Sequence, residues 1–250
     1  MTTRLFHVSD IHFGAENRAA LASVERAISA ETPDALICTG DLTQRAKHSE
    51  YAAAAAWFEG LGVPVVLEPG NHDMPYYNLF ERFADPYRRY RRLARRVVSP
   101  FESEDVVLVS LRTTVRAQRR FPWSDGVVTP RALSTTLKRL ACLRSDPRHV
   151  IVTAHHPLLG PEGKARNPTI RGNRAFAAIA EAGADAVLTG HVHVPFDELR
   201  ESGGHSARMI GAGTLSTRLR GDAPPSYRVI TCQRGGAMTT ELRELTSALR

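Results

Sequence analysis

The feature that most constrains the fold is an alternation of short apolar runs and helix-like segments over the first seventy residues. Runs at 5–8, 35–38 and 63–67 have the length and composition of buried strands. Between them, 17–30 has apolar residues at helical spacing, and the alanine-rich stretch 49–59 also favours a helix. This β-α-β-α-β order predicts parallel strands joined by right-handed crossovers.

Beyond residue 75 the alternation is less regular. The stretch 75–99 predicts one or two helices, and 112–128 is irregular. Strands are expected at 106–111, 149–153, 186–188, 207–210, 227–231 and 238–242, and helices at 130–143 and 173–182. Because no helix separates the strands after residue 196, we expect an antiparallel portion near the C-terminus. We expect one α/β domain over 1–250, with an arginine-rich, cap-like insertion at about 75–100.

Composition narrows the class of protein. The chain has 250 residues, 42% hydrophobic and 24% charged, which is typical of a globular protein. No apolar run approaches the roughly 20 residues that span a bilayer, and the N-terminus lacks the pattern of a signal peptide. Cysteines at 38, 142 and 232 are few, odd in number and widely spaced, which argues against a disulfide framework. Together these features predict a cytoplasmic protein without a transmembrane segment.

The formal net charge of +7 comes almost entirely from arginine. One interpretation is an anionic partner such as phosphate, nucleic acid or acidic lipid, since a positive field attracts anions. The other is a compositional bias without functional meaning. Composition leaves both open.

Aspartate, asparagine and histidine cluster where the predicted strands end. The clusters are Asp10-Ile11-His12, Gly40-Asp41, Gly70-Asn71-His72-Asp73, His155-His156 and Gly190-His191-Val192-His193. Because open α/β sheets bind ligands beyond the carboxyl ends of their strands, we expect these clusters to converge in space. A single histidine at a strand end is more often an ordinary hydrogen-bonded residue, but here five clusters support one another.

The residue types in these clusters point to metal ions. The candidate ligands are Asp10, His12, Asp41, Asn71, His155, His191 and His193. Oxygen donors mixed with imidazoles suit manganese, iron or zinc, and the absence of cysteine from the clusters argues against an iron–sulfur site. Seven ligands are too many for one tetrahedral ion but enough for two, if one carboxylate bridges. A pair of ions can clamp the attacking and leaving oxygens of a displacement at phosphorus.

These motifs, in this order, resemble those of calcineurin-like metallophosphoesterases, and the resemblance extends from residue 4 to about 215. The sequence around Asp41 and the arginine- and tyrosine-rich segment after the third motif are most similar to bacterial members described as cyclic-nucleotide phosphodiesterases. The resemblance implies a four-layer αββα sandwich of two mixed sheets flanked by helices.

The resemblance also implies a role for each motif residue. One metal would be held by Asp10, His12, Asp41 and His193, and a second by Asp41, Asn71, His155 and His191, with Asp41 bridging. A hydroxide between the metals would attack phosphorus. His72 would protonate the leaving oxygen or stabilise its charge, and Asp73 would orient His72.

Substrate-binding residues are less clearly indicated. His156 follows a candidate ligand directly, so its side chain points elsewhere, either toward substrate or into packing. The irregular stretch 112–128 predicts a loop at the pocket rim, where Arg119 and Arg120 are candidates for phosphate binding. The arginines at 82–96 fit a cap, a surface for nucleic acid or lipid phosphate, or simply a solvated helix face.

The sequence therefore predicts a dinuclear-metal phosphodiesterase of a small phosphodiester, with a cyclic nucleotide as one candidate. A phosphomonoesterase, a nuclease and a lipid-pyrophosphate hydrolase are alternatives on the same site, although a nucleic-acid partner is not favoured. An alternative of another class is a binding module that has lost catalysis. Metal identity and oligomeric state, including a dimer, stay open.

Overall fold

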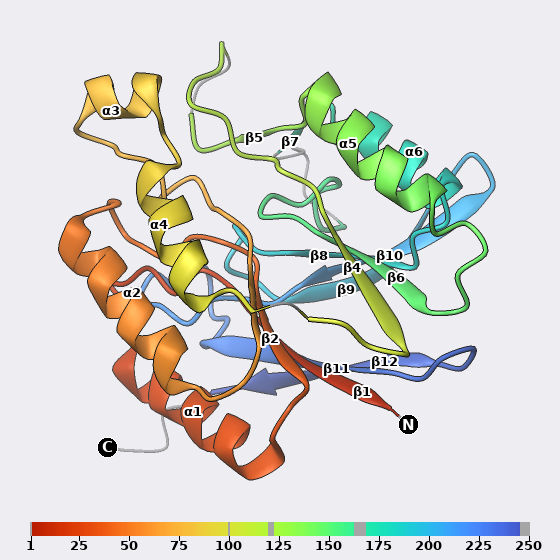
Figure 1. Ribbon diagram of the computed structural model, residues 1–250, viewed down its shortest axis with the longest axis horizontal. Coiled ribbons are helices and arrows are strands. Elements are labelled where there is room, and N and C mark those ends of the chain that lie inside the picture. The colour runs from red at the N-terminus through yellow and green to blue at the C-terminus, as the bar shows by residue number, and fades with distance from the viewer. Residues whose placement is uncertain (1, 100, 120–122, 163–168, 246–250) are drawn as a thin grey trace.

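The structure, a computed structural model, describes residues 2–99, 101–119, 123–162 and 169–245. Within these residues the main elements are two five-stranded sheets that face each other, with helices on the outer face of each sheet (Figure 1). Each sheet is mixed, because parallel strands are joined by at least one antiparallel neighbour. The expectation of two mixed sheets flanked by helices is confirmed.

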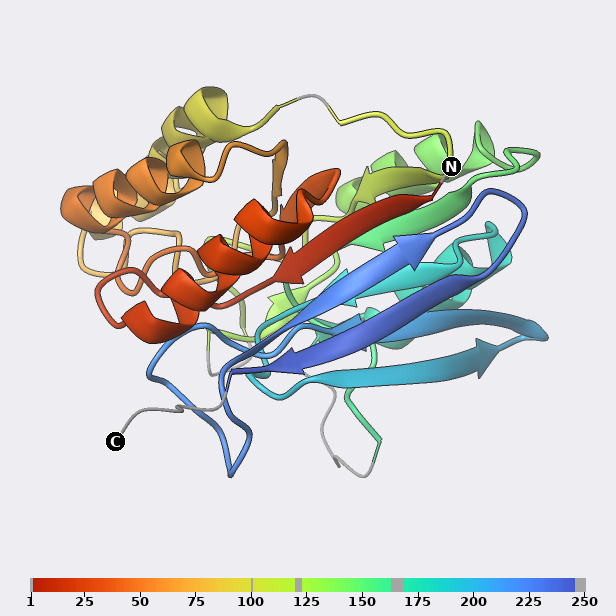
Figure 2. The same ribbon diagram turned by 90° about the horizontal axis from the view of Figure 1, so that it is seen from below.

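The first sheet is built around the N-terminal strand. Its order is β12-β11-β1-β2-β3, with β1 at Thr3–Val8, β2 at Ala35–Cys38, β3 at Val65–Leu67, β11 at Ser226–Cys232 and β12 at Met238–Glu244. Strands β1, β2 and β3 are parallel, as the β-α-β-α-β pattern predicts. The C-terminal strands β11 and β12 return antiparallel beside β1 (Figure 2).

The second sheet comes from the middle of the chain. Its order is β4-β6-β8-β10-β9, with β4 at Val106–Ser110, β6 at His149–Thr153, β8 at Ala186–Thr189, β9 at Phe196–Ser202 and β10 at His205–Gly211. Only β9 runs antiparallel to its neighbour within this described sheet. Short strands β5 (Gly126–Val127) and β7 (Thr169–Ile170) form a separate parallel pair.

Helices cover the outer faces of both sheets (Figure 1). Helices α1 (Arg18–Glu31), α2 (His48–Gly60) and α4 (Arg88–Val97) lie beside the first sheet, and α5 (Pro130–Ala141) and α6 (Gly172–Glu181) beside the second. Asn17 caps the N-terminus of α1 by accepting a hydrogen bond from the Ala20 amide, and Thr129 caps that of α5 by accepting one from the Ala132 amide. No described helix is long and apolar enough to cross a membrane.

The layers are held together by apolar side chains that alternate along each strand. Leu5 and Ile151 are buried in a cluster between the two sheets. Their neighbours Phe6 and Val152 point the other way, into clusters beneath the helices. Because successive strand residues face opposite sides, both sheets must be covered on both faces, which explains the continuous apolar runs of their central strands.

The arginine-rich segment 75–100 forms two helices, α3 (Leu79–Ala84) and α4. Helix α4 packs against α2 and buries Tyr90 and Leu93 in the first helical layer. Its arginines mostly pair with carboxylates: Arg88 and Arg89 with Glu81, and Arg96 with Glu59. These contacts favour a structural, partly solvated helix face for α4.

Candidate metal centre

The candidate ligands meet where the carboxyl ends of the two sheets adjoin. Strands β1, β2 and β3 lead into Asp10, His12, Asp41 and Asn71, whereas β6 and β8 lead into His155, His191 and His193. Within each of several overlapping groups, all ligand atoms lie within 4.8 Å of one another. Those groups are Asp10–His12–His193, Asp10–Asp41–His155, His12–Asp41–His72 and His155–His156–His191.

The first group has the spacing of ligands around a single ion. Nε2 of His12 lies 3.2 Å from Nε2 of His193, 3.7 Å from Oδ2 of Asp41 and 3.8 Å from Oδ1 of Asp10. Tetrahedral ligands at usual zinc distances would be roughly 3.3–3.6 Å apart. Moreover, Oδ1 of Asp10 is buried without a hydrogen-bond partner in the described part of the chain. This oxygen lies 3.2 Å from Nε2 of His193, and a buried carboxylate oxygen flanked by imidazole nitrogens fits a cation.

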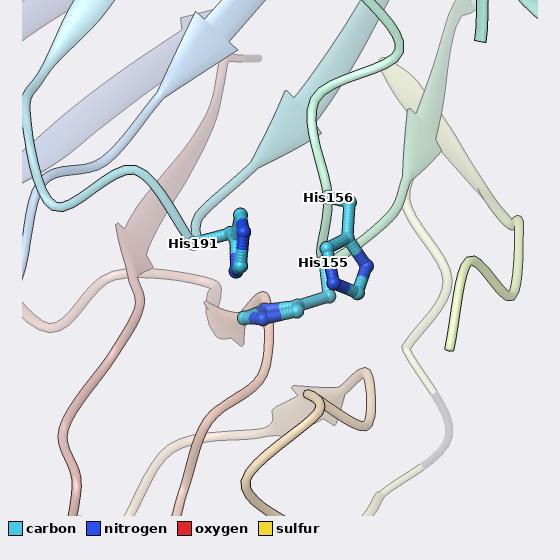
Figure 3. A group of neighbouring side chains, drawn as sticks. All are labelled: His155, His156 and His191. Atoms are coloured by element: carbon cyan, nitrogen blue, oxygen red, sulfur yellow. The ribbon is translucent and has the colours of Figure 1, made fainter. Parts of the chain in front are cut away.

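The second group is centred on Asn71. Its Oδ1 lies 3.1 Å from Nε2 of His155 and 3.1 Å from Nδ1 of His191, and the first of these nitrogens lies 3.5 Å from Oδ1 of Asp41. Figure 3 shows the rings of His155, His156 and His191 gathered at the ends of their strands. The two carboxylate oxygens of Asp41 thus approach different groups, which is the geometry of a bridging ligand.

The backbone is strained at these positions. Left-handed φ values occur at Asp10 (53°), His12 (51°), Asp41 (52°), His191 (68°) and His193 (60°). Such a conformation costs on the order of 1–3 kcal/mol per non-glycine residue and persists only where surrounding contacts enforce it. Here the Asp10 amide donates to the Gly40 carbonyl, the His12 amide to the Asp41 carbonyl, and the His191 amide to Oδ2 of Asp10. Strain concentrated at the candidate ligands is typical of a functional site.

Two glycines allow the loops to approach closely. A Cβ on Gly70 would lie 2.1 Å from both the amide nitrogen and Oδ1 of Asp41, and one on Gly190 would lie 1.7 Å from Oγ of Ser9. Neither distance is sterically allowed, so the motif glycines are required by the contact between neighbouring loops.

Backbone carbonyls orient the imidazoles. Nδ1 of His155 donates to the Thr39 carbonyl at 2.7 Å, and Nδ1 of His193 donates to the Arg218 carbonyl. Nδ1 of His72 donates to the Gln44 carbonyl at 2.7 Å. Because a carbonyl can only accept, Nδ1 carries the proton and Nε2 of each ring is left to face the site.

The electrostatics of the groups suit a cation. Burial opposes ionisation of Asp10 and Asp41, but His193 beside the first and His155 beside the second hold the pKa of each carboxyl well below its usual range. Burial lowers the pKa of His12 to about 3, so this ring is neutral. Burial also opposes a charge on His155, but Asp41 raises its pKa to about 9. Ionised carboxylates and imidazoles at this spacing fit metal ions, which would take the place of the protons.

The carboxylate of Asp73 makes its hydrogen bonds to the neighbouring loops and not to the His72 ring, so the orienting role that the resemblance implied stays a prediction. Its carboxylate accepts hydrogen bonds from the amides of Leu42, Thr43 and Gly70, and from the Thr43 hydroxyl. The ring of His72 is held by the Gln44 carbonyl instead. Asp73 therefore ties the loop after β2 to the loop after β3, and so positions Asp41 relative to Asn71.

For His156 the structure favours packing, the second of the two alternatives that the sequence left open. Nε2 donates to the Ser124 carbonyl and Nδ1 accepts from the Thr113 hydroxyl, each at 2.9 Å, and burial lowers its pKa well below the usual value. With both nitrogens engaged, this ring has no free donor or acceptor for substrate. It ties Thr113 and Ser124 to the site beside His191, whose ring centroid is 4.4 Å away.

The first arginine-rich segment contacts the second one through Arg82, Arg116 and Trp123. Arg82 donates from Nε to the Arg116 carbonyl at 2.7 Å and lies over the ring of Trp123 at 5.7 Å. Arg119 is exposed, and Arg120 lies outside the described residues, so its predicted role stays a prediction. The structure instead brings Arg218 to the site, on a loop outside all five motifs where no sequence signal marked it.

Comparison with known proteins agrees with this arrangement. The calcineurin-like phosphoesterase family model matches residues 3–195 of the chain. The chain belongs to this family. It is therefore a metal-dependent phosphoric ester hydrolase by family membership, as the motifs predict.

Two curated relatives are similar to this phosphoesterase in sequence, and two solved structures are similar to it in fold. It is 28% identical over 209 residues to a probable cyclic nucleotide phosphodiesterase from Pseudoalteromonas sp., covering 78% of this chain and 73% of that protein. It is 26% identical over 209 residues to another from Synechococcus sp., covering 78% and 75%. A dimetal phosphatase from Danio rerio has the same fold, with a TM-score of 0.62 at 12% identity, covering 95% of this chain and 98% of that one. A purple acid phosphatase from yellow lupin aligns with a TM-score of 0.66 at 13% identity, covering 98% and 52%.

Proposed function

We propose that this phosphoesterase is a dinuclear-metal phosphodiesterase acting on a small phosphodiester, with a cyclic nucleotide as one candidate. The observation that carries the proposal is the pair of ligand groups that share Asp41. The first would consist of Asp10, His12, Asp41 and His193, and the second of Asp41, Asn71, His155 and His191. Manganese, iron and zinc all suit these oxygen and nitrogen donors.

Bound ions would supply Lewis-acid stabilisation of the phosphoryl oxygens and lower the pKa of an attacking water. The remaining work falls to the protein. With Nδ1 fixed on the Gln44 carbonyl, Nε2 of His72 is left to face the site, and the doubly protonated ring would donate a hydrogen bond or its Nε2 proton to the leaving oxygen. Asp73 and the backbone network keep the ligand-bearing loops in register.

The preference for a diester is supported by the names of the relatives. Two of them are called probable cyclic nucleotide phosphodiesterases. A third, the glycerophosphodiester phosphodiesterase GpdQ of Enterobacter lignolyticus, is 34% identical over 80 residues, which is 28% of this chain and 29% of that protein. The shared chemistry is hydrolysis of one ester bond of a phosphodiester.

The test is hydrolysis by metal-stripped protein after adding back manganese, iron, zinc or magnesium. Bis(p-nitrophenyl) phosphate is compared with p-nitrophenyl phosphate, with Asp41→Ala as the inactive variant and the exposed Asp222→Asn as the matched control. We expect metal-dependent turnover of the diester above the monoester, with two ions bound per chain.

Each other outcome points to a different function. A preference for the monoester would make the protein a phosphomonoesterase. Binding of one ion alone would contradict the dinuclear centre. No turnover of either ester with ions bound would favour the binding-module interpretation. Among natural substrates, cyclic nucleotides, nucleic acids and lipid phosphodiesters are then compared directly.

A further inference from the structure

Arg218 lies on the loop after β10, beyond the residues that the family model matches. Hydrogen bonds between hydroxyl groups and the backbone fix this loop to the metal centre. The Thr214 hydroxyl donates to the Asp10 carbonyl at 2.7 Å, and the Arg218 amide donates to Oγ of Ser216 at 3.2 Å. The Arg218 carbonyl accepts from Nδ1 of His193. The position of the residue is therefore set by its backbone, independently of its side chain.

The guanidinium of Arg218 reaches into the site. Its Nη1 lies 3.1 Å from Nε2 of His72, 3.4 Å from Nε2 of His12 and 3.4 Å from Oε1 of Gln44. The residue is partly buried. It thus stands between a candidate ligand of the first metal and the histidine that faces the leaving oxygen.

No carboxylate oxygen of the residues that the structure describes lies within 4.0 Å of the Arg218 guanidinium nitrogens. The arginines of α4 differ, since Arg88 and Arg89 share Glu81. A partly buried cation without a counter-ion is unfavourable. A phosphoryl group would supply the missing negative charge, and the planar fork of a guanidinium matches two oxygens of such a group.

We propose that Arg218 is a substrate-binding residue that holds an anionic oxygen of the phosphoryl group beside His72. This assignment rests on the proposed function, because it places the phosphoryl group at the metal centre. The guanidinium would form an ion pair with the phosphoryl group of any phosphate ester, whichever ester the enzyme prefers.

The probe for this role is inorganic phosphate, whose binding can be measured without any turnover of an ester. Its dissociation constant is measured by titration calorimetry on metal-loaded protein for the wild type, Arg218→Gln and Arg218→Lys. Metal content is measured in parallel. Arg220→Gln is the matched control, since Arg220 is exposed on the same loop.

We expect Arg218→Gln to weaken phosphate binding by about 10- to 100-fold, the range for a lost charge-assisted hydrogen bond. Arg218→Lys should recover part of this loss, and the metal content and the Arg220→Gln variant should match the wild type. Equal phosphate affinity in Arg218→Gln and wild type, loss of metal from Arg218→Gln, or no phosphate binding by wild type would each overturn the assignment. If phosphate binding depends on Arg218 but no ester is hydrolysed, the proposed function fails while this inference stands.

Discussion

Replacing Thr214 by valine should test whether buried hydrogen bonds hold the loop after β10. Thr214 and Ser216 are fully buried. The Thr214 hydroxyl donates to the Asp10 carbonyl at 2.7 Å, accepts from the Ser216 amide at 3.1 Å and contacts Oγ of Ser216 at 2.8 Å. Valine has nearly the same shape, so the substitution removes these bonds without opening a cavity.

The expected loss in the free energy of unfolding follows from the hydrogen-bonding groups that Thr214→Val leaves unpaired. Two buried backbone groups, the Asp10 carbonyl and the Ser216 amide, lose a partner at about 1–3 kcal/mol each. The added methyl group returns roughly 1 kcal/mol. We therefore expect Thr214→Val to lower the free energy of unfolding by about 1–5 kcal/mol, which for a chain of this size lowers Tm by about 2–20 °C.

The assay is equilibrium unfolding in the presence of a chelator, because bound metal would add its own stabilisation. Thr214→Ser keeps the hydroxyl and should lose only about 1 kcal/mol, the value of one buried methyl group. Thr135→Val at an exposed position is the matched control, since the Thr135 hydroxyl donates to the Arg131 carbonyl of its own helix and to no other residue that the structure describes. If Thr214→Ser is less stable than Thr214→Val, apolar packing dominates at this position and the hydrogen-bond argument is wrong.

Three further predictions concern the centre itself. Asp41→Ala should abolish binding of both ions in metal analysis, and retention of two ions would refute its bridging position. His72→Ala should keep the ions and lose turnover, least for esters with good leaving groups, whereas equal loss across a leaving-group series would argue against its action on the leaving oxygen. Gly190→Ala should destabilise the protein by about 1–3 kcal/mol in denaturant unfolding, because its Cβ would overlap Oγ of Ser9. Gly60→Ala, with open space around the new methyl group, is its control, and equal stability of the two variants would contradict the steric argument.

The choice of candidate ligands could be predicted from sequence because the rule involved is local. In a parallel sheet every strand delivers its next residues to the same edge, so Asp10 and Asp41 must approach each other once β1 and β2 are in register. His155 follows β6 in the second sheet, and it reaches them because the two sheets pack face to face. The left-handed turns that aim several of these side chains have no comparable sequence signal, since aspartate and histidine seldom adopt such φ values without enforcement from their surroundings.

The contacts of Asp73, His156 and Arg218 depend on the tertiary structure and could not be predicted from the sequence. Asp73 and His156 sit beside candidate ligands in sequence, but their hydrogen bonds go to neighbouring loops, and only the folded chain shows which loops those are. Arg218 is distant from every motif in sequence. It lies at the site because β10 pairs with β8 and because Thr214, on the loop after β10, donates to the Asp10 carbonyl.

Residue types and their spacing were enough to predict most of the strand–helix order, the family and the candidate ligand set, although strands β5 and β7 were not expected. The structure decided how the C-terminal strands divide between the sheets, with β9 and β10 in the second and β11 and β12 beside β1. That division depends on pairings between segments far apart in the chain, for which spacing carries no information. The same long-range pairings place Arg218 over the site.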